Sequence, residues 1–117
     1  MNYLMRLREI VLFSLLALIV SGSCFAADRP TKALFIYGGW DGHAPERFRD
    51  LIVPWLKSEG FEVRVSSNLD PYTDKQYMSE VDLIVQIYTQ GKITREQVMG
   101  LLTAVQNGAG IAGWHGG

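Results

Sequence analysis

Four short strand-like segments alternate with helix-like segments after residue 31, and this alternation restricts the folds open to the chain. The strand-like segments cover residues 33–37, 61–65, 83–88 and 109–113. The first and third are almost wholly apolar, which is typical of strands buried on both faces. Strands that alternate with helices predict right-handed crossovers and a parallel sheet. We therefore expect an α/β fold, a flavodoxin-like three-layer sandwich with strand order 2-1-3-4, truncated after its fourth strand.

The segment after the first strand predicts an amphipathic helix. Pro45 suits its first turn, where a missing N–H costs nothing, and Gly60 suits its end. Pro54 falls inside the segment and predicts a kink or a restart of the helix. The apolar residues at helical spacing, among which we expect Trp55 to belong to the core, are Phe48, Leu51, Ile52, Trp55 and Leu56.

Two residue pairs with capping-box spacing predict further helix starts. Thr73 with Gln76 predicts a short helix through about residue 78. Thr94 with Gln97 predicts a second helix that Asn107-Gly108 ends. The apolar face of that second helix is expected to contain Val98, Leu101, Leu102 and Val105.

Residues 1–26 predict a secretory signal peptide. Arg6 and Arg8 precede an apolar run over residues 10–20, and small residues lead to Ala26 as the cleavage position. Cleavage there would remove Cys24, the single cysteine of the chain. The alternatives are an uncleaved membrane anchor and a lipoprotein acylated on Cys24. We expect a periplasmic or secreted protein with no stable membrane anchor after cleavage. Residues 27–117 are long enough for one small domain.

The charge pattern and the glycine spacing exclude two kinds of partner. The formal net charge is −1, and no basic stripe of the kind that nucleic-acid binding needs is present. The glycine-rich turn at residues 38–43 lacks the spacing of a dinucleotide-binding fingerprint. We therefore expect a small-molecule ligand and no nucleic acid, while the oligomeric state stays unassigned.

Both histidines of the chain follow strand-like segments in glycine-rich turns. In open parallel sheets ligands bind beyond the carboxyl ends of the strands, and an imidazole titrates near neutral pH. We therefore predict His43 and His115 as catalytic groups. The alternative for each is a turn histidine whose ring hydrogen-bonds to the backbone.

Neighbouring residues in these turns predict the rest of the site. Trp40 and Trp114 are predicted to stack on a ligand ring, or else to plug the end of the sheet. Asp41, Thr89 and Gln90 are predicted to bind substrate, with a purely structural turn as the alternative for each.

A divalent metal such as zinc stays an open possibility. The ends of the first and fourth strands should lie roughly 10 Å apart, because one strand separates them, and the imidazoles of His43 and His115 could converge across that gap. Zinc requires further ligands, and Asp41 or Glu46 is the acid available nearby. The sequence itself assigns no cofactor.

The chain resembles the ThuA-like, trehalose-utilisation family in four motifs that occur in order. They are GGWDGH at residues 38–43, DLIV at 82–85, Thr89 and Gly91 ahead of Ile93-Thr94, and GAGIAGWHGG at 108–117. This family is similar in fold to class I glutamine amidotransferases, and in the turn where those enzymes carry a cysteine nucleophile this chain carries His115.

The resemblance implies a role in carbohydrate utilisation, on a trehalose-type disaccharide or a derivative of one. Family members run to roughly twice the length that follows residue 26, so the resemblance implies an incomplete domain, its N-terminal part only. The alternatives are a non-catalytic carbohydrate-binding or sensory module and a non-functional fragment. Whether the chain is an enzyme is left open.

Overall fold

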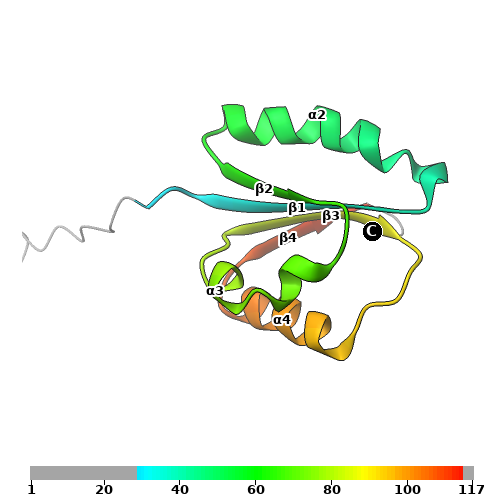
Figure 1. The fold of residues 1–117 in the computed structure, drawn as a ribbon. Coiled ribbons are helices and arrows are strands. Elements are labelled where there is room, and N and C mark those ends of the chain that lie inside the picture. Colours follow the sequence, from blue (N-terminus) through cyan, green and yellow to red (C-terminus); the bar gives the residue numbers. More distant parts are fainter. Residues whose placement is uncertain (1–28, 115–117) are drawn as a thin grey trace, which may run out of the picture.

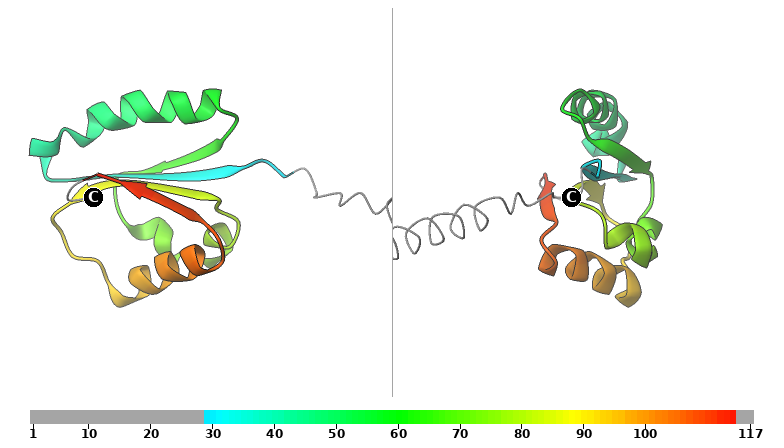
Figure 2. Two further views of the ribbon diagram at one scale, coloured as in Figure 1. Left: turned by 180° about the vertical axis from the view of Figure 1, so that it is seen from behind. Right: turned by 90° about the vertical axis from the view of Figure 1, so that its left-hand side faces the viewer.

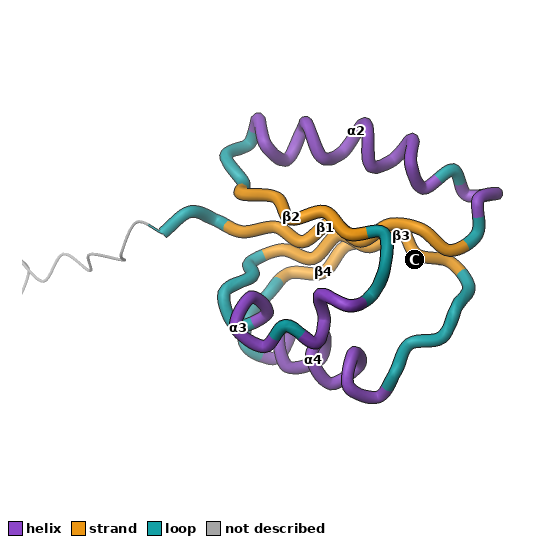
Figure 3. Tube along the Cα trace, viewed as in Figure 1, coloured by secondary structure: helices purple, strands orange, loops and turns teal. Residues whose placement is uncertain are grey.

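The computed structural model describes residues 29–114; the predicted signal segment and His115 lie outside that range. The elements follow in the order β1 (Lys32–Gly39), η1 (Asp41–His43), α2 (Pro45–Ser58), β2 (Glu62–Ser66), η2 (Asp70–Thr73), α3 (Lys75–Met78), β3 (Leu83–Thr89), α4 (Arg95–Gln106) and β4 (Gly110–Gly113). The strands form one parallel sheet with the order β2-β1-β3-β4 (Figures 1 and 3). The predicted α/β fold and flavodoxin-like strand order are confirmed.

Helices cover both faces of the sheet, which gives three layers. Helix α2 lies on one face, and η2, α3 and α4 lie on the other (Figure 2). Successive residues of β1 alternate between the two cores: Ala33 and Phe35 pack on the α2 side, and Leu34 and Ile36 pack on the α4 side. All four side chains are fully buried. Burial on both faces explains the unbroken apolar run of this central strand.

Helix α2 is continuous through Pro54, so the predicted restart is wrong. Pro54 lies on the exposed side of the helix, where water can satisfy the carbonyl that its missing N–H leaves without a partner. The prediction of Trp55 as a core residue is also wrong, because its side chain is 54% exposed. Val53 and Leu56 are buried instead. The helix therefore presents a narrower apolar stripe than the sequence suggested, and Leu51, like Trp55, faces away from the sheet.

The short helix α3 begins one residue later than predicted, with a different cap. Asp74 is its N-cap, and the Asp74 carboxylate accepts the Tyr77 N–H at 3.1 Å. The predicted cap, Thr73, instead belongs to η2, where its hydroxyl donates to the Asp70 carbonyl. The predicted pair of Thr73 and Gln76 is therefore not a capping box.

Helix α4 begins with the predicted capping box. The Thr94 hydroxyl accepts the Gln97 N–H at 3.2 Å, and the Gln97 side chain accepts the Thr94 N–H at 3.0 Å. Its inward face is centred on Ala104, which is buried, whereas Leu102 and Val105 are exposed. These two side chains were predicted to face the core, and this part of the prediction is wrong.

The outer strand β4 pairs with β3 alone among the described residues, and all four of its residues are exposed. Ile111, the large apolar residue of β4, is 53% exposed. Within residues 29–114, β4 is therefore an edge strand, with the pairing hazard that such an edge carries.

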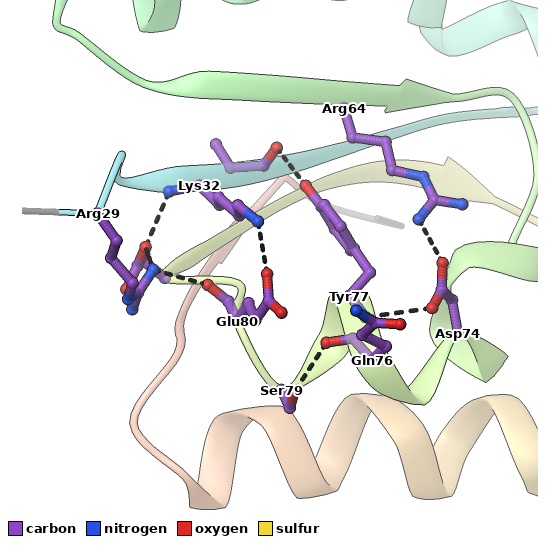
Figure 4. Close-up of polar contacts among 10 residues, drawn as sticks. Arg29, Lys32, Arg64, Asp74, Gln76, Tyr77, Ser79 and Glu80 are labelled. Atoms are coloured by element: carbon purple, nitrogen blue, oxygen red, sulfur yellow. Dashed lines mark hydrogen bonds and ion pairs between the residues drawn. The ribbon is translucent and has the colours of Figure 1, made fainter.

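Polar contacts tie the amino ends of β1 and β3 together (Figure 4). The Asp82 carboxylate accepts two hydrogen bonds from the Arg29 guanidinium, at 2.6 and 2.9 Å, and one from the Lys32 N–H at 2.8 Å. Lys32 also pairs with Glu80 at 2.5 Å. The Arg29 hydrogen bonds lower the pKa of the Asp82 carboxyl below its usual range. These contacts help to set the register in which the opposite, carboxyl ends of the strands meet.

Candidate functional site at the carboxyl ends of the strands

Strands β1 and β3 approach each other very closely at their carboxyl ends. Gly39 is paired with Thr89, and the next N–H, that of Trp40, donates to the Thr89 carbonyl at 2.8 Å. A Cβ atom on Gly39 would lie 1.9 Å from that carbonyl oxygen, and the φ of Gly39 is +81°. Only glycine accommodates both the contact and the backbone angle. The turn after β1 is thereby held over Thr89.

Thr89 also holds the imidazole of His43. The two side chains share a hydrogen bond of 2.7 Å between His43 Nδ1 and Thr89 Oγ1. Both residues are half-buried. The single turn η1, which ends at His43, turns the ring back toward β3. Thr89 therefore fixes one ring nitrogen of His43 and with it the orientation of the imidazole.

Trp40 completes this cluster. Its ring meets the His43 ring edge-on, with centroids 4.8 Å apart, and its side chain remains 48% exposed. The structure thus brings together three of the residues predicted for the site: Trp40, His43 and Thr89. We refer to these three as the Trp-His-Thr cluster.

Asp41 and Gln90 border the Trp-His-Thr cluster without joining it. Asp41 is exposed and opens η1, and its carbonyl accepts the Ala44 N–H at 2.8 Å. Gln90 directly follows Thr89 and is also exposed. Neither the Asp41 nor the Gln90 side chain makes a hydrogen bond among the described residues.

Two strained backbone positions flank the cluster. Ala44 follows His43 with φ of 47°, and Gln90 follows Thr89 with φ of 62°. Left-handed backbone costs a non-glycine residue roughly 1–2 kcal/mol. They are the only non-glycine residues with positive φ in the described range, 29–114. Such strain concentrates at ligand-binding and catalytic sites.

Trp114 lies on the α2 side of the same sheet edge. Its ring centroid is 4.9 Å from that of Phe48 in the first turns of α2, and its side chain is 38% exposed. Trp114 therefore packs on a helix and also offers part of its surface to solvent. The predicted catalytic residue His115 directly follows it and falls outside the described residues.

Sequence reasoning missed a second polar group near this edge. The Arg49 guanidinium lies 4.9 Å from the centre of the Tyr37 ring and donates to the Tyr37 hydroxyl at 3.0 Å. Hydrogen bonds to Asp50 and to Tyr37 raise the pKa of Arg49 above its ordinary value. The only signal was the hydroxyl of Tyr37 at the end of an otherwise apolar strand, and nothing in the sequence paired it with Arg49.

The described residues do not assemble a metal site. Between residues 29 and 114 no group of three or more His, Cys, Asp or Glu side chains is placed to hold a metal ion. Asp41 and Glu46, the acids considered as ligands, are both exposed.

Comparison with known proteins identified one family. The sequence model of the ThuA family, described as trehalose utilisation, matches residues 32–117. The match begins with β1 and includes the Trp-His-Thr cluster, Trp114 and the residues that follow it. Searches of curated proteins and of solved structures found no match.

Proposed function

The chain belongs to the ThuA family, which is described as trehalose utilisation, and from this premise we propose that it binds a sugar-derived small molecule at the carboxyl ends of β1, β3 and β4. The ligand is a trehalose-type disaccharide or a derivative of one. The observation that carries this proposal is the Trp-His-Thr cluster. In it His43 Nδ1 lies 2.7 Å from Thr89 Oγ1, and the imidazole of His43 packs beside the half-exposed indole of Trp40. This arrangement stands where parallel sheets bind ligands.

Each member of the cluster has a role that suits a sugar. An indole face packs against the apolar C–H face of a pyranose, and Trp40 has surface available for that contact. Imidazole exchanges protons with hydroxyl groups near neutral pH. Thr89 positions the ring, and Trp114 forms a second aromatic wall on the α2 side. In this proposal His43 and His115 are the acid–base groups, and Asp41 and Gln90 bind sugar hydroxyls.

Sugar binding can be tested with the chain's own tryptophans. Trehalose is titrated into the 117-residue protein while tryptophan fluorescence is recorded, and the affinity is checked by calorimetry. Trp40→Ala should weaken binding at least tenfold, a loss of about 1.4 kcal/mol. Trp55→Ala is the matched control, because Trp55 is similarly exposed (54% against 48%) but lies on the outer side of α2. Equal effects of the two substitutions would contradict the proposed location of the site.

Turnover separates an enzyme from a binding module. The bound sugar is incubated with the protein and its products are followed by NMR. Products that disappear in His43→Ala or His115→Ala, while trehalose still binds, establish acid–base catalysis. Saturable binding without any product supports the carbohydrate-binding or sensory module instead. No binding of trehalose or of its oxidised derivatives would refute the proposed ligand class.

We propose further that the protein is exported, with cleavage after Ala26. The support is the sequence of residues 1–26, with its basic start, apolar run and small residues before Ala27. Among residues 29–114, none of the helices is long and apolar enough to cross a membrane. Mass spectrometry of the protein isolated from the periplasm or medium should give an N-terminus at Ala27. Intact protein retained in the membrane fraction would contradict export.

A further inference from the structure

A groove on the α4 side of the molecule is separate from the Trp-His-Thr cluster. It runs between α4 and the segment formed by η2 and α3, and has a volume of about 680 Å³. Its α4 wall extends from Arg95 to Asn107, which at 1.5 Å per residue is about 18 Å of helix. The volume lies within the range of small-molecule sites.

Small residues on α4 let this helix approach η2 closely at the base of the groove. Gly100 packs against the backbone of η2 so closely that a Cβ atom there would lie 1.8 Å from the Tyr72 carbonyl oxygen. Ala104 follows one turn later and is buried. Because Gly100 has no side chain, α4 and η2 come into direct contact there, and both Gly100 and Tyr72 line the groove at this contact.

The floor of the groove is apolar. Tyr72, Met78 and Ala104 contribute to it and are buried, while Met99 lines it with a side chain that is 54% exposed. Covering such a surface is favourable in proportion to the apolar area removed from water. Methionine also adapts its shape to the groups that pack on it.

The rim carries two cations without partners. Lys75 and Arg95 line the groove, and neither makes an ion pair or a hydrogen bond through its side chain in the part of the chain that the structure describes. The Glu96 carboxylate is the one acidic group on the rim. The balance of charge at the groove is therefore positive.

From these features we propose that the groove binds an anionic amphiphile, a molecule with an extended apolar body and a carboxylate, sulfate or phosphate head. The apolar body lies along α4 over Met78 and Ala104, and the head meets Lys75 and Arg95. A saturated chain is a zigzag that advances less per carbon than its bond length of about 1.5 Å, so at least about a dozen carbons are needed to fill the length of the groove. This site is distinct from the sugar site and goes beyond the function proposed above.

The test compares two amphiphiles of equal chain length and opposite charge. Dodecanoate and dodecyltrimethylammonium, each below its micellar concentration, are titrated calorimetrically into the 117-residue protein. Dodecanoate should bind at least tenfold more tightly. The double variant Lys75→Glu/Arg95→Glu should reverse this preference. Because both residues are exposed and lack partners, the charge reversal should leave the fold intact, which circular dichroism checks.

Two further variants locate the binding. Lys57→Glu, an exposed and unpaired charge on α2, is the matched control and should change neither affinity. Thr103→Phe fills the groove from an exposed position and should weaken both amphiphiles. The proposal would be overturned if the two amphiphiles bound with equal affinity. It would also be overturned if Lys57→Glu had as large an effect as the double variant, or if binding survived Thr103→Phe. Binding of neither probe would also overturn it.

Discussion

Replacing Gly39 by alanine tests whether the close approach of β1 and β3 builds the candidate site. The new methyl group would lie 1.9 Å from the Thr89 carbonyl oxygen, a backbone atom that no side-chain rotation can move. The φ of +81° adds a left-handed penalty of roughly 1–2 kcal/mol. Separating the strands also breaks the hydrogen bond from Trp40 N–H to Thr89, worth about 1 kcal/mol. We expect Gly39→Ala to lower the free energy of unfolding by about 2–3 kcal/mol in total.

The matched control is Gly60→Ala. Gly60 also has a positive φ, +90°, but no atom lies within 4 Å of the position its Cβ would occupy. This variant therefore measures the backbone penalty without the clash, and we expect a loss of about 1–2 kcal/mol. Urea denaturation followed by circular dichroism measures the free energy of unfolding of both variants. This free energy falls with urea concentration by about 1–3 kcal/mol/M, so the two unfolding midpoints should be clearly separated. Equal losses in the two variants would refute the argument that contact with Thr89 requires glycine.

Three further predictions follow from other features. Ala44→Gly should raise the free energy of unfolding by about 1 kcal/mol, measured by urea denaturation, because glycine removes the left-handed strain and is the better N-cap. Asp82→Asn should destabilise the protein at pH 6, and its effect should shrink as the pH falls below about 4. The lowered pKa of Asp82 means that its stabilising contribution is fully present above about pH 4, its unfolded pKa, and is lost as the pH falls through the lower folded value. Ile111→Lys should reduce self-association in light scattering, because it places a charge on the open edge of β4.

The strand order could be predicted from the sequence because each step had a local signal. The apolar runs and the segments between them fix the alternation of strands and helices, and chirality then restricts the crossovers. The Thr94–Gln97 capping box was equally predictable, because both of its bonds are made within four consecutive residues. Features that depend on neighbouring residues alone can be inferred without a structure.

The phase of α2 could not be predicted in the same way. The apolar residues of this segment spread over more of the helix surface than the sheet can cover, and periodicity alone does not choose between Val53 and Trp55. In the structure Val53 packs against the sheet and is buried, whereas Trp55 lies on the solvent-exposed side of α2. The cap of α3 shows a similar limit, because Thr73 and Asp74 are both good N-cap residues and only the extent of η2 decides between them.

The candidate site shows that strand topology predicts which turns lie together but not which of their side chains make contact. Topology places the turns after β1 and β3 at one edge, which the sequence predicts. The contact between His43 and Thr89, however, requires Gly39 to pair with Thr89 and Ala44 to adopt φ of 47°. The first condition is a register set by the packing of whole strands, and the second is a conformation that alanine disfavours. Since local preference opposes this geometry at Ala44 and at Gln90, the surrounding structure must impose it, and the strain is held at the two positions that directly follow His43 and Thr89.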